Sequence, residues 1–201
     1  MTIREWRTLD TDIVFRAGDY FQVRCERVEL PDGTQIDYYT TVRRDVALVA
    51  ALTERDELVL VRQFKQGARA ITLELPGGEF DHSGEDPLDA ATRELAEETG
   101  YACRELRLVG LQFDDASRNN NRVHVYLGTG AYPLGEQNLD HNERASGIEV
   151  QLYPLAEAPA LLADGLIKAQ SSVAGLYRIL HELPIKAGAV SGAPGHLLPG
   201  G

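Results

Sequence analysis

A glycine-rich turn that leads into an acidic helix, at residues 77–101, constrains the fold of this chain more than any other stretch. Asp86 is suited to cap the helix N-terminus, and Pro87 suits the first helical position. Gly100 suits the helix end, because glycine readily adopts the left-handed conformation that stops a helix. The stretch therefore predicts a capped helix over residues 87–99.

The predicted helix has an apolar side and an acidic side. The apolar side is expected to be buried and consists of Leu88, Ala91 and Leu95. Glu94 and Glu98 are four residues apart, so their carboxylates lie on one side, with Glu97 on the adjoining flank. Like charges at this spacing repel, and a divalent cation would turn that repulsion into coordination, because hard cations prefer carboxylate oxygens. The acidic side is therefore either a metal site or a solvated helix face.

Composition and charge exclude several classes of protein. The 201 residues, 43% hydrophobic and 25% charged, suit one globular domain with a small appendage. The net charge of −11 argues against a nucleic-acid partner, which would need a basic surface. No apolar run is long enough to span a membrane, and the first residues lack the apolar centre of a signal peptide. Cys25 and Cys103 show no CxxC pattern and indicate buried thiols, so we expect a cytoplasmic protein without membrane contact.

Alternating patterns and apolar runs predict many strands and two late helices. Residues 1–43 are expected to form a small antiparallel sheet that turns at residues 31–33. The strands expected after it cover residues 45–52, 58–65, 71–75, 106–113, 123–131 and 148–152, and the late helices cover 155–163 and 171–183. This order favours an α/β fold in which helices cover both faces of a mixed sheet. We expect an N-terminal β-rich subdomain at 1–43, a main domain at 44–186 and a flexible tail at 187–201.

Several polar residues outside the helix have two interpretations. Arg62 and Lys65 end a strand and are either solvated or in contact with an anionic substrate. The loop at 114–122 is either a plain surface turn or a substrate-contacting loop. Residues 133–146 are expected to form a long acidic loop. His124 and His141 are expected to be structural or surface residues, because a magnesium-type site prefers oxygen ligands.

The segment from Gly78 to Tyr101 resembles the Nudix signature, G-x5-E-x7-R-E-U-x-E-E-x-G-U, where U is bulky and apolar. The matching positions after the turn are Glu85, Arg93, Glu94, Leu95, Glu97, Glu98 and Gly100. There is one departure: six residues separate Gly78 from Glu85 where the signature has five, so the loop carries an extra residue around positions 82–83.

The flanking segments resemble the ADP-ribose pyrophosphatase branch of the Nudix hydrolases. The similar stretches are residues 61–65, 73–78, 118–124 and 136–140. The resemblance implies a Nudix-type α/β/α sandwich with a small N-terminal antiparallel sheet, and a homodimer that uses this sheet. It also implies hydrolysis of ADP-ribose to AMP and ribose 5-phosphate with Mg²⁺ or Mn²⁺. A proline that often marks ADP-ribose hydrolysers is absent around residues 116–118, so GDP-mannose or another nucleotide sugar is an alternative substrate. A nucleotide-sugar sensor without catalysis is a further alternative, although the motif glutamates are intact.

The resemblance also implies roles for individual residues. The metal ligands would be the Gly77 carbonyl, Glu94, Glu97 and Glu98, with Glu97 also among the catalytic residues. Arg93 and Glu85 would brace the turn against the helix. Glu143, in the loop before the last strand, would be the catalytic base. The candidates for contact with the substrate are Arg62, Lys65, Glu74 and Arg122.

Overall fold

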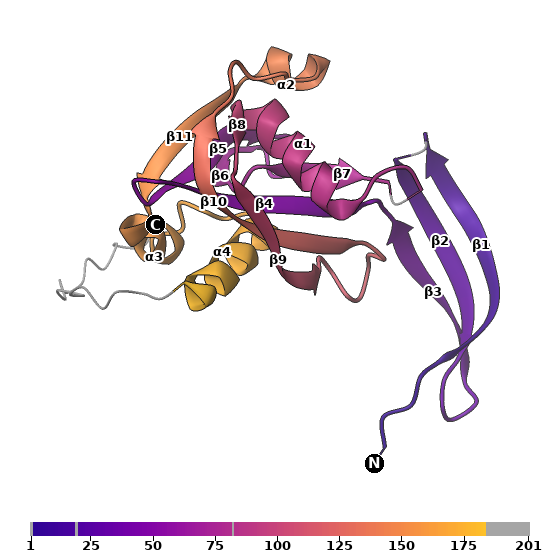
Figure 1. The fold of residues 1–201 in the computed structure, drawn as a ribbon. Helices are drawn as coiled ribbons and strands as arrows, with labels where there is room; N and C mark the ends of the chain where they lie inside the picture. The colour runs from indigo at the N-terminus through magenta and orange to yellow at the C-terminus, as the bar shows by residue number, and fades with distance from the viewer. Residues whose placement is uncertain (1, 19, 82, 184–201) are drawn as a thin grey trace, which may run out of the picture.

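The computed structural model describes residues 2–18, 20–81 and 83–183, and the predicted tail at 187–201 lies outside these residues. The strands are β1 (Arg7–Ala17), β2 (Phe21–Glu29), β3 (Gln35–Val42), β4 (Asp45–Thr53), β5 (Glu57–Lys65), β6 (Ala70–Glu74), β7 (Gly77–Phe80), β8 (Tyr101–Ala102), β9 (Glu105–Phe113), β10 (Arg122–Pro133) and β11 (Ile148–Pro154). The helices are α1 (Pro87–Thr99), α2 (His141–Ser146), α3 (Ala158–Ala163) and α4 (Gln170–Glu182), with a 3₁₀ turn, η1 (Leu155–Glu157), before α3. Figure 1 shows a sheet-and-helix body from which β1, β2 and β3 project.

The body is built on a mixed sheet with the strand order β11-β5-β4-β10-β8. β6 pairs with β5, β7 with β4 and β9 with β10. β10 runs parallel to β4, and the other pairs are antiparallel. α1 covers one face, while α3 and α4 cover the other (Figure 1). The predicted α/β fold with a small N-terminal antiparallel sheet is therefore confirmed.

The continuous apolar run of β4 explains the layered core. Ala47, Val49 and Ala51 point to α1, while Leu48, Ala50 and Leu52 point to α3 and α4. All six side chains are at most 5% exposed, as expected for a strand covered on both faces. Because β4 lies in the middle of the sheet, the glycine turn that pairs with it through β7 is held against the core.

The caps of α1 are those that the sequence predicts. The Asp86 carboxylate accepts a hydrogen bond from the Leu88 N–H at 2.9 Å, and Gly100, with φ of 70°, donates its N–H to the Ala96 carbonyl. The predicted buried face is partly wrong, because Leu88 is 40% exposed. The buried face is shifted towards Ala90, Ala91, Glu94, Leu95, Glu98 and Thr99. The small alanines let the helix lie close to β4, and this orientation turns two of the glutamates inward.

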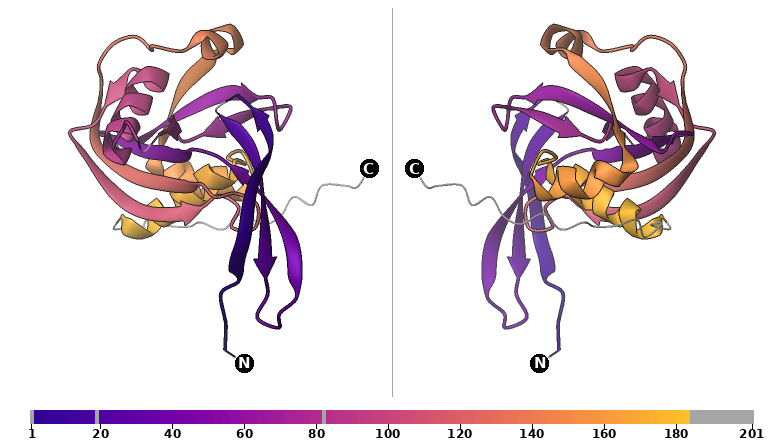
Figure 2. Two further views of the ribbon diagram at one scale, coloured as in Figure 1. Left: turned by 90° about the vertical axis from the view of Figure 1, so that its right-hand side faces the viewer. Right: turned by 90° about the vertical axis from the view of Figure 1, so that its left-hand side faces the viewer.

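The N-terminal strands form a separate antiparallel sheet, β1-β2-β3, that extends away from the body (Figure 2). The loop predicted as either a surface turn or a substrate loop joins this sheet to the body. The Tyr38 hydroxyl donates to the Ser117 carbonyl, and the Thr41 N–H donates to the Arg118 carbonyl at 2.7 Å. The Arg43 N–H donates to the side-chain oxygen of Asn120 at 2.7 Å. These hydrogen bonds fasten the N-terminal sheet to the loop of the body.

Several segments of the structure differ from the elements that the patterns predict, and two of them are longer than three residues. Residues 141–146, expected to be part of a long loop, form the short helix α2, because Asp140 and Glu143 make a capping box. Residues 77–80, expected to be a turn, pair with β4 as the strand β7. None of the helices in the described part of the chain is long and apolar enough to cross a membrane.

Candidate active site

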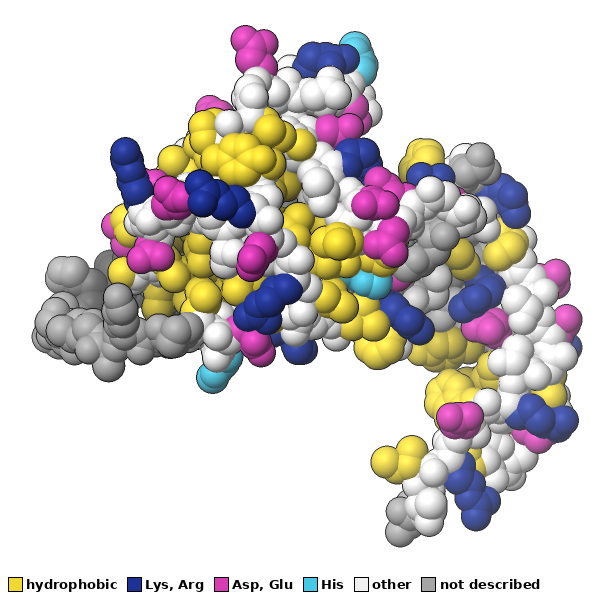
Figure 3. All heavy atoms as spheres, in the orientation of Figure 1, with side chains coloured by type: hydrophobic (Ala, Val, Ile, Leu, Met, Phe, Trp, Pro, Cys, Tyr) yellow, Lys and Arg dark blue, Asp and Glu magenta, His cyan; other side chains and the backbone are white. Residues whose placement is uncertain are grey.

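The second half of α1 and the glycine turn form the centre of the candidate site. Glu98 is only 4% exposed, and its carboxylate accepts a hydrogen bond from the Gly77 N–H at 2.7 Å. A Cβ atom at Gly78 would lie 2.5 Å from the carboxylate of Glu94, and one at Gly77 would lie 2.1 Å from the Ala47 carbonyl oxygen. The two glycines are therefore required for the close approach of the turn to the acidic helix. Acidic side chains gather over α1 and β7 on the face shown in Figure 3.

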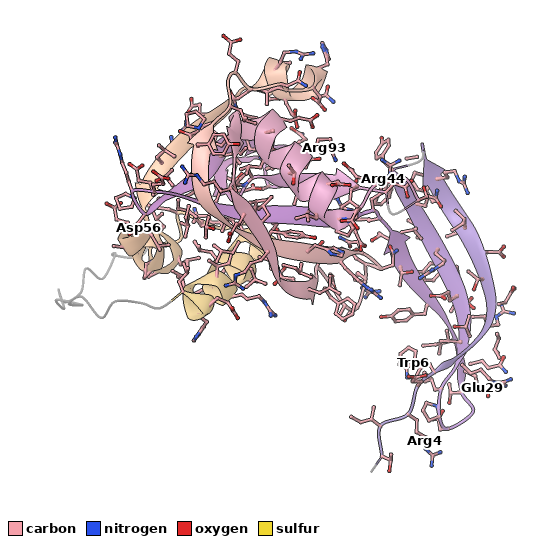
Figure 4. The ribbon with its side chains drawn as sticks, in the orientation of Figure 1. Arg4, Trp6, Glu29, Arg44, Asp56 and Arg93 are labelled. Carbon is pink, nitrogen blue, oxygen red and sulfur yellow. The ribbon has the colours of Figure 1, made fainter. Side chains whose placement is uncertain are left out.

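Arg93, on α1 (Figure 4), connects the acidic residues of the motif. Its guanidinium donates to both carboxylate oxygens of Glu85, at 2.8 and 2.9 Å. The same guanidinium donates to Glu94 at 2.6 Å and to Glu97 at 2.9 Å. The bidentate pair holds the loop against the helix, and the extra residue between Gly78 and Glu85 does not prevent it. The hydrogen bonds from Arg93 lower the pKa of Glu85.

Burial disfavours the ionised form of the two inward carboxylates, Glu94 and Glu98. Burial raises the pKa of Glu98 to about 8, and the charges of Glu94 and Glu143 act in the same direction. The Gly77 N–H and the Lys65 ammonium oppose this rise. Burial likewise raises the pKa of Glu94, against the opposing effect of Arg93. A cation bound between these two carboxylates would stabilise their ionised form.

The donor chemistry of the site suits a hard divalent cation. Carboxylate and carbonyl oxygens are the ligands that Mg²⁺ and Mn²⁺ prefer, and Glu94, Glu97 and Glu98 supply them beside the Gly77 backbone. Among residues 2–18, 20–81 and 83–183, no three acidic, histidine or cysteine side chains are already arranged as a closed metal site. The reason is visible in the contacts: Arg93 holds Glu94 and Glu97, and the Gly77 N–H holds Glu98. A cation would compete with these donors for the carboxylates.

Lys65 and Glu74 lie on the same side of the sheet as the α1 glutamates. The Lys65 ammonium is 3.9 Å from the Glu74 carboxylate, and its charge acts on Glu98. Thr72, which the sequence patterns did not single out, lies between them and contacts the Glu74 carboxylate through its hydroxyl. The end of the β5–β6 hairpin therefore offers one cation and several oxygen groups next to the glutamates.

Arg62 and Arg122, predicted to contact the substrate, are not brought together with the glutamates. The alternation of β5 turns Arg62 towards the face covered by α3 and α4, where it pairs with Glu149 at 2.7 Å. Arg122 is exposed at the start of β10, and its backbone N–H donates to Asp45 at 2.8 Å. Both side chains are accessible, but they lie on parts of the surface other than the one that carries the α1 glutamates.

Glu143 lies on α2, beyond the end of α1 in Figure 1. It is near enough for its charge to raise the pKa of both Glu94 and Glu98. Its carboxylate accepts a hydrogen bond from the Asp140 N–H at 2.7 Å, and so forms half of the capping box. The Asp-x-x-Glu spacing is the signal in the sequence that predicts such a helix start.

The two histidines lie where the sequence patterns place them, apart from the acidic cluster. His124 is buried, with its Nε2 3.1 Å from the Asp45 carboxylate and its ring edge-on to Phe80. His141 is exposed at the start of α2.

Both parts of the chain match known family models. Residues 42–173 match the family model described as the NUDIX domain, and residues 6–42 match the model described as the nucleoside diphosphate sugar hydrolase N-terminal domain. The chain is 30% identical to an ADP-ribose pyrophosphatase of Bacillus subtilis, over 74% of this chain and 80% of that protein.

One further relative and one solved structure extend the comparison. A CMP-5'-(N-acetyl-N-hydroxy-3-aminopropyl)phosphonate hydrolase of Streptomyces rubellomurinus is 29% identical, over 80% and 76% of the two chains. A crystal structure of ADP compounds hydrolase has the same fold, with a TM-score of 0.78 and 21% identity, and covers 90% of this chain and 96% of that chain.

Proposed function

Because this chain belongs to the Nudix family and is a Nudix hydrolase, we propose that it hydrolyses the pyrophosphate bond of a nucleoside diphosphate sugar. ADP-ribose is the proposed substrate, and AMP and ribose 5-phosphate are the proposed products. The observation that carries the proposal is the buried carboxylate pair Glu94 and Glu98, set against a glycine turn. Arg93 holds Glu94, and the Gly77 N–H holds Glu98. The match of residues 6–42 to the nucleoside diphosphate sugar hydrolase N-terminal domain favours this substrate class, and the Bacillus subtilis relative favours ADP-ribose within it.

The motif residues have two proposed roles, to bind the metal ion and to hold the glycine turn in place. Glu94, Glu97 and Glu98, with the Gly77 carbonyl, would hold Mg²⁺ or Mn²⁺. An ion held there would supply positive charge that offsets the charge of the phosphate oxygens and makes water a stronger nucleophile. Arg93 and Glu85 keep the glycine turn against the helix.

Lys65 and Glu143 are the residues proposed to act on the substrate phosphates and on the attacking water. Lys65 supplies positive charge for the phosphates in a chain whose net charge is −11. Water attacks one phosphorus, the bond from that phosphorus to the bridging oxygen breaks, and the bridging oxygen leaves with the other phosphate. Glu143 takes the proton of the attacking water. One of its carboxylate oxygens accepts the Asp140 N–H, and the other can accept the proton.

A panel of nucleotide conjugates tests the proposed substrate. We expect ADP-ribose to give a higher kcat/KM than GDP-mannose or a CMP conjugate, each measured with Mg²⁺ and with Mn²⁺ by separating the products. The Streptomyces relative, nearly as similar as the Bacillus one, is the reason to include the CMP conjugate. A higher kcat/KM for GDP-mannose would replace the substrate but keep the reaction. Tight binding without any product would favour a sensing role instead.

We also propose that the protein is a homodimer joined through residues 1–43, with residues 44–186 as the catalytic domain. The N-terminal sheet exposes large apolar side chains: Trp6, Leu9, Ile13, Val14, Phe15, Tyr20, Ile36 and Tyr39, which are 36–66% exposed. A sheet this small needs an apolar face covered by another layer, and the body leaves it projecting (Figure 2). A second copy of the chain would provide that layer.

Light scattering after size-exclusion chromatography tests the dimer. We expect the wild-type protein to have twice the chain mass of 22.1 kDa, and Phe15→Glu to shift it towards one chain mass. Phe15 is 54% exposed on β1, and a carboxylate there could not be buried without a partner. The matched control is Phe113→Glu, which changes a 64% exposed phenylalanine on β9 of the body. Dissociation by the control alone would place the interface on the body.

A further inference from the structure

The C-terminal end of α1 is capped by a distant segment, residues 134–138. The last carbonyls of a helix have no partner within the helix, so they need donors from elsewhere. The Glu97 carbonyl accepts from the Asn138 N–H at 2.9 Å, and the Gly100 carbonyl accepts from the Leu134 N–H at 2.7 Å. The Glu98 carbonyl accepts from the side-chain amide of Gln137.

Gln137 differs from the other donors because it reaches two elements at once. Its Nε2 also donates to the Ile148 carbonyl, at 3.2 Å, where β11 begins. A glutamine amide has two N–H donors, and both are used here. Within the described part of the chain, Gln137 is the residue whose side chain caps the carbonyls of 97–100. It therefore ties the last turn of α1 to the strand that pairs with β5.

The last turn of α1 needs such support more than most helix ends. It contains Glu97 and Glu98 and no basic residue, so its charges oppose the helix dipole. The Glu98 carboxylate reaches Gly77 from this turn, and a last turn that frays would move it away. Segment 134–138 also packs closely against the end of α1, because a Cβ at Gly100 would lie 2.3 Å from the Gly135 carbonyl oxygen.

We infer that Gln137 is a positioning residue for the candidate metal site: its amide holds the last turn of α1 so that the Glu98 carboxylate keeps its place beside Gly77. This inference rests on the proposed function, since it assumes that Glu98 serves as a metal ligand. Residues that orient a ligand from outside typically contribute about 10–100-fold to metal affinity or activity.

The test uses Mn²⁺ alone, followed by electron paramagnetic resonance, with the full chain and two variants. Gln137→Glu keeps the shape but turns carboxylate oxygens towards two carbonyl oxygens, and Gln137→Ala leaves room for water to donate instead. We expect the Kd for Mn²⁺ to rise about tenfold in Gln137→Glu and less in Gln137→Ala. With the best substrate, kcat should fall by a similar factor while KM stays within about twofold, because Gln137 acts through Glu98.

The matched control is Gln112→Glu. Gln112 also donates its side-chain amide to a backbone carbonyl, that of Ser171 at 3.3 Å, but it fastens α4 on the other face of the sheet. The Gln112→Glu substitution should leave the Kd for Mn²⁺ unchanged. A folded Gln137→Glu with the wild-type Kd would overturn the inference, and so would an equal loss in Gln112→Glu. If the wild-type protein itself binds no Mn²⁺, the proposed metal site fails together with the inference.

Discussion

Glu98→Gln is expected to lower kcat/KM by about a thousandfold while the protein stays folded. The substitution keeps the shape and leaves an oxygen that can accept the Gly77 N–H. It removes the negative charge that would hold the ion, and the stabilisation of transition-state charge by a bound ion amounts to several kcal/mol. Each 1.36 kcal/mol corresponds to about tenfold in rate, which gives the expected factor.

The same substitution should change how stability depends on pH. The ordinary carboxyl pKa is 4.5, and burial raises that of Glu98 to about 8. Between these values the folded metal-free protein holds a proton that the unfolded chain has lost, so stability falls as the pH rises towards about 8. The loss is on the order of a few kcal/mol, and Gln at position 98 would not show it.

Calorimetry at several pH values, with and without Mg²⁺, separates these effects. Metal-free Glu98→Gln should have a higher Tm than the wild type near pH 9 and a similar Tm near pH 5. Mg²⁺ should raise the wild-type Tm more at pH 9 than at pH 6, and should raise the variant little. Glu54→Gln is the control, because Glu54 is 64% exposed in an ion pair with Arg104. Undiminished turnover in Glu98→Gln would remove Glu98 from the site.

Arg93→Met is expected to have the second largest effect, on both stability and rate. Its guanidinium compensates the charges of Glu85, Glu94 and Glu97 at once. Removing one partner of a buried pair costs about 3–5 kcal/mol, and Arg93 is 36% exposed, so we expect about 2 kcal/mol. This corresponds to a fall in Tm of about 4–8 °C for a chain of this size.

The rate and the response to metal identify the role of Arg93. Because the glycine turn would lose its brace, kcat/KM should fall about a hundredfold. Mg²⁺ should recover part of the lost Tm, since the ion would replace the missing positive charge. Arg104→Met is the control, because it removes an ion pair that is 69% and 64% exposed and should cost less than about 1 kcal/mol. A normal rate in a destabilised Arg93→Met would limit Arg93 to a purely structural role.

The strands and the capped helix follow from local patterns, and so the sequence predicts them well. The apolar run of β4 and the caps at Asp86 and Gly100 each depend on a few neighbouring residues. The buried face of α1 was less predictable, because helical spacing alone does not choose between Leu88 and the small Ala90. That choice depends on how closely the helix approaches β4, which is a property of the whole fold.

The candidate site was predictable where its residues lie within one motif. The contact between Glu85 and Arg93 joins residues close in the chain, and the resemblance to the Nudix signature implies it. The contact of Arg93 with Glu94 was not predicted. The role of Gln137 depends on a contact across 39 positions, for which local spacing gives no signal. Arg62 was predicted to be either solvated or in contact with the substrate. Strand alternation turns it to the face opposite the α1 glutamates, and the resemblance alone did not indicate this.

The parallel pairing of β4 with β10 has a consequence for the order of folding. Val46 pairs with Val123, so the glycine turn and the whole of α1 lie in the chain loop that this pairing closes. Closing such a loop costs entropy before the contacts that reward it have formed, which makes the pairing a slow step. On the ribosome, the acidic helix would emerge well before the strand that completes its sheet. The glycine turn that contacts Glu94 and Glu98 precedes α1 in the chain, so this part of the site would be able to form before β10 is added.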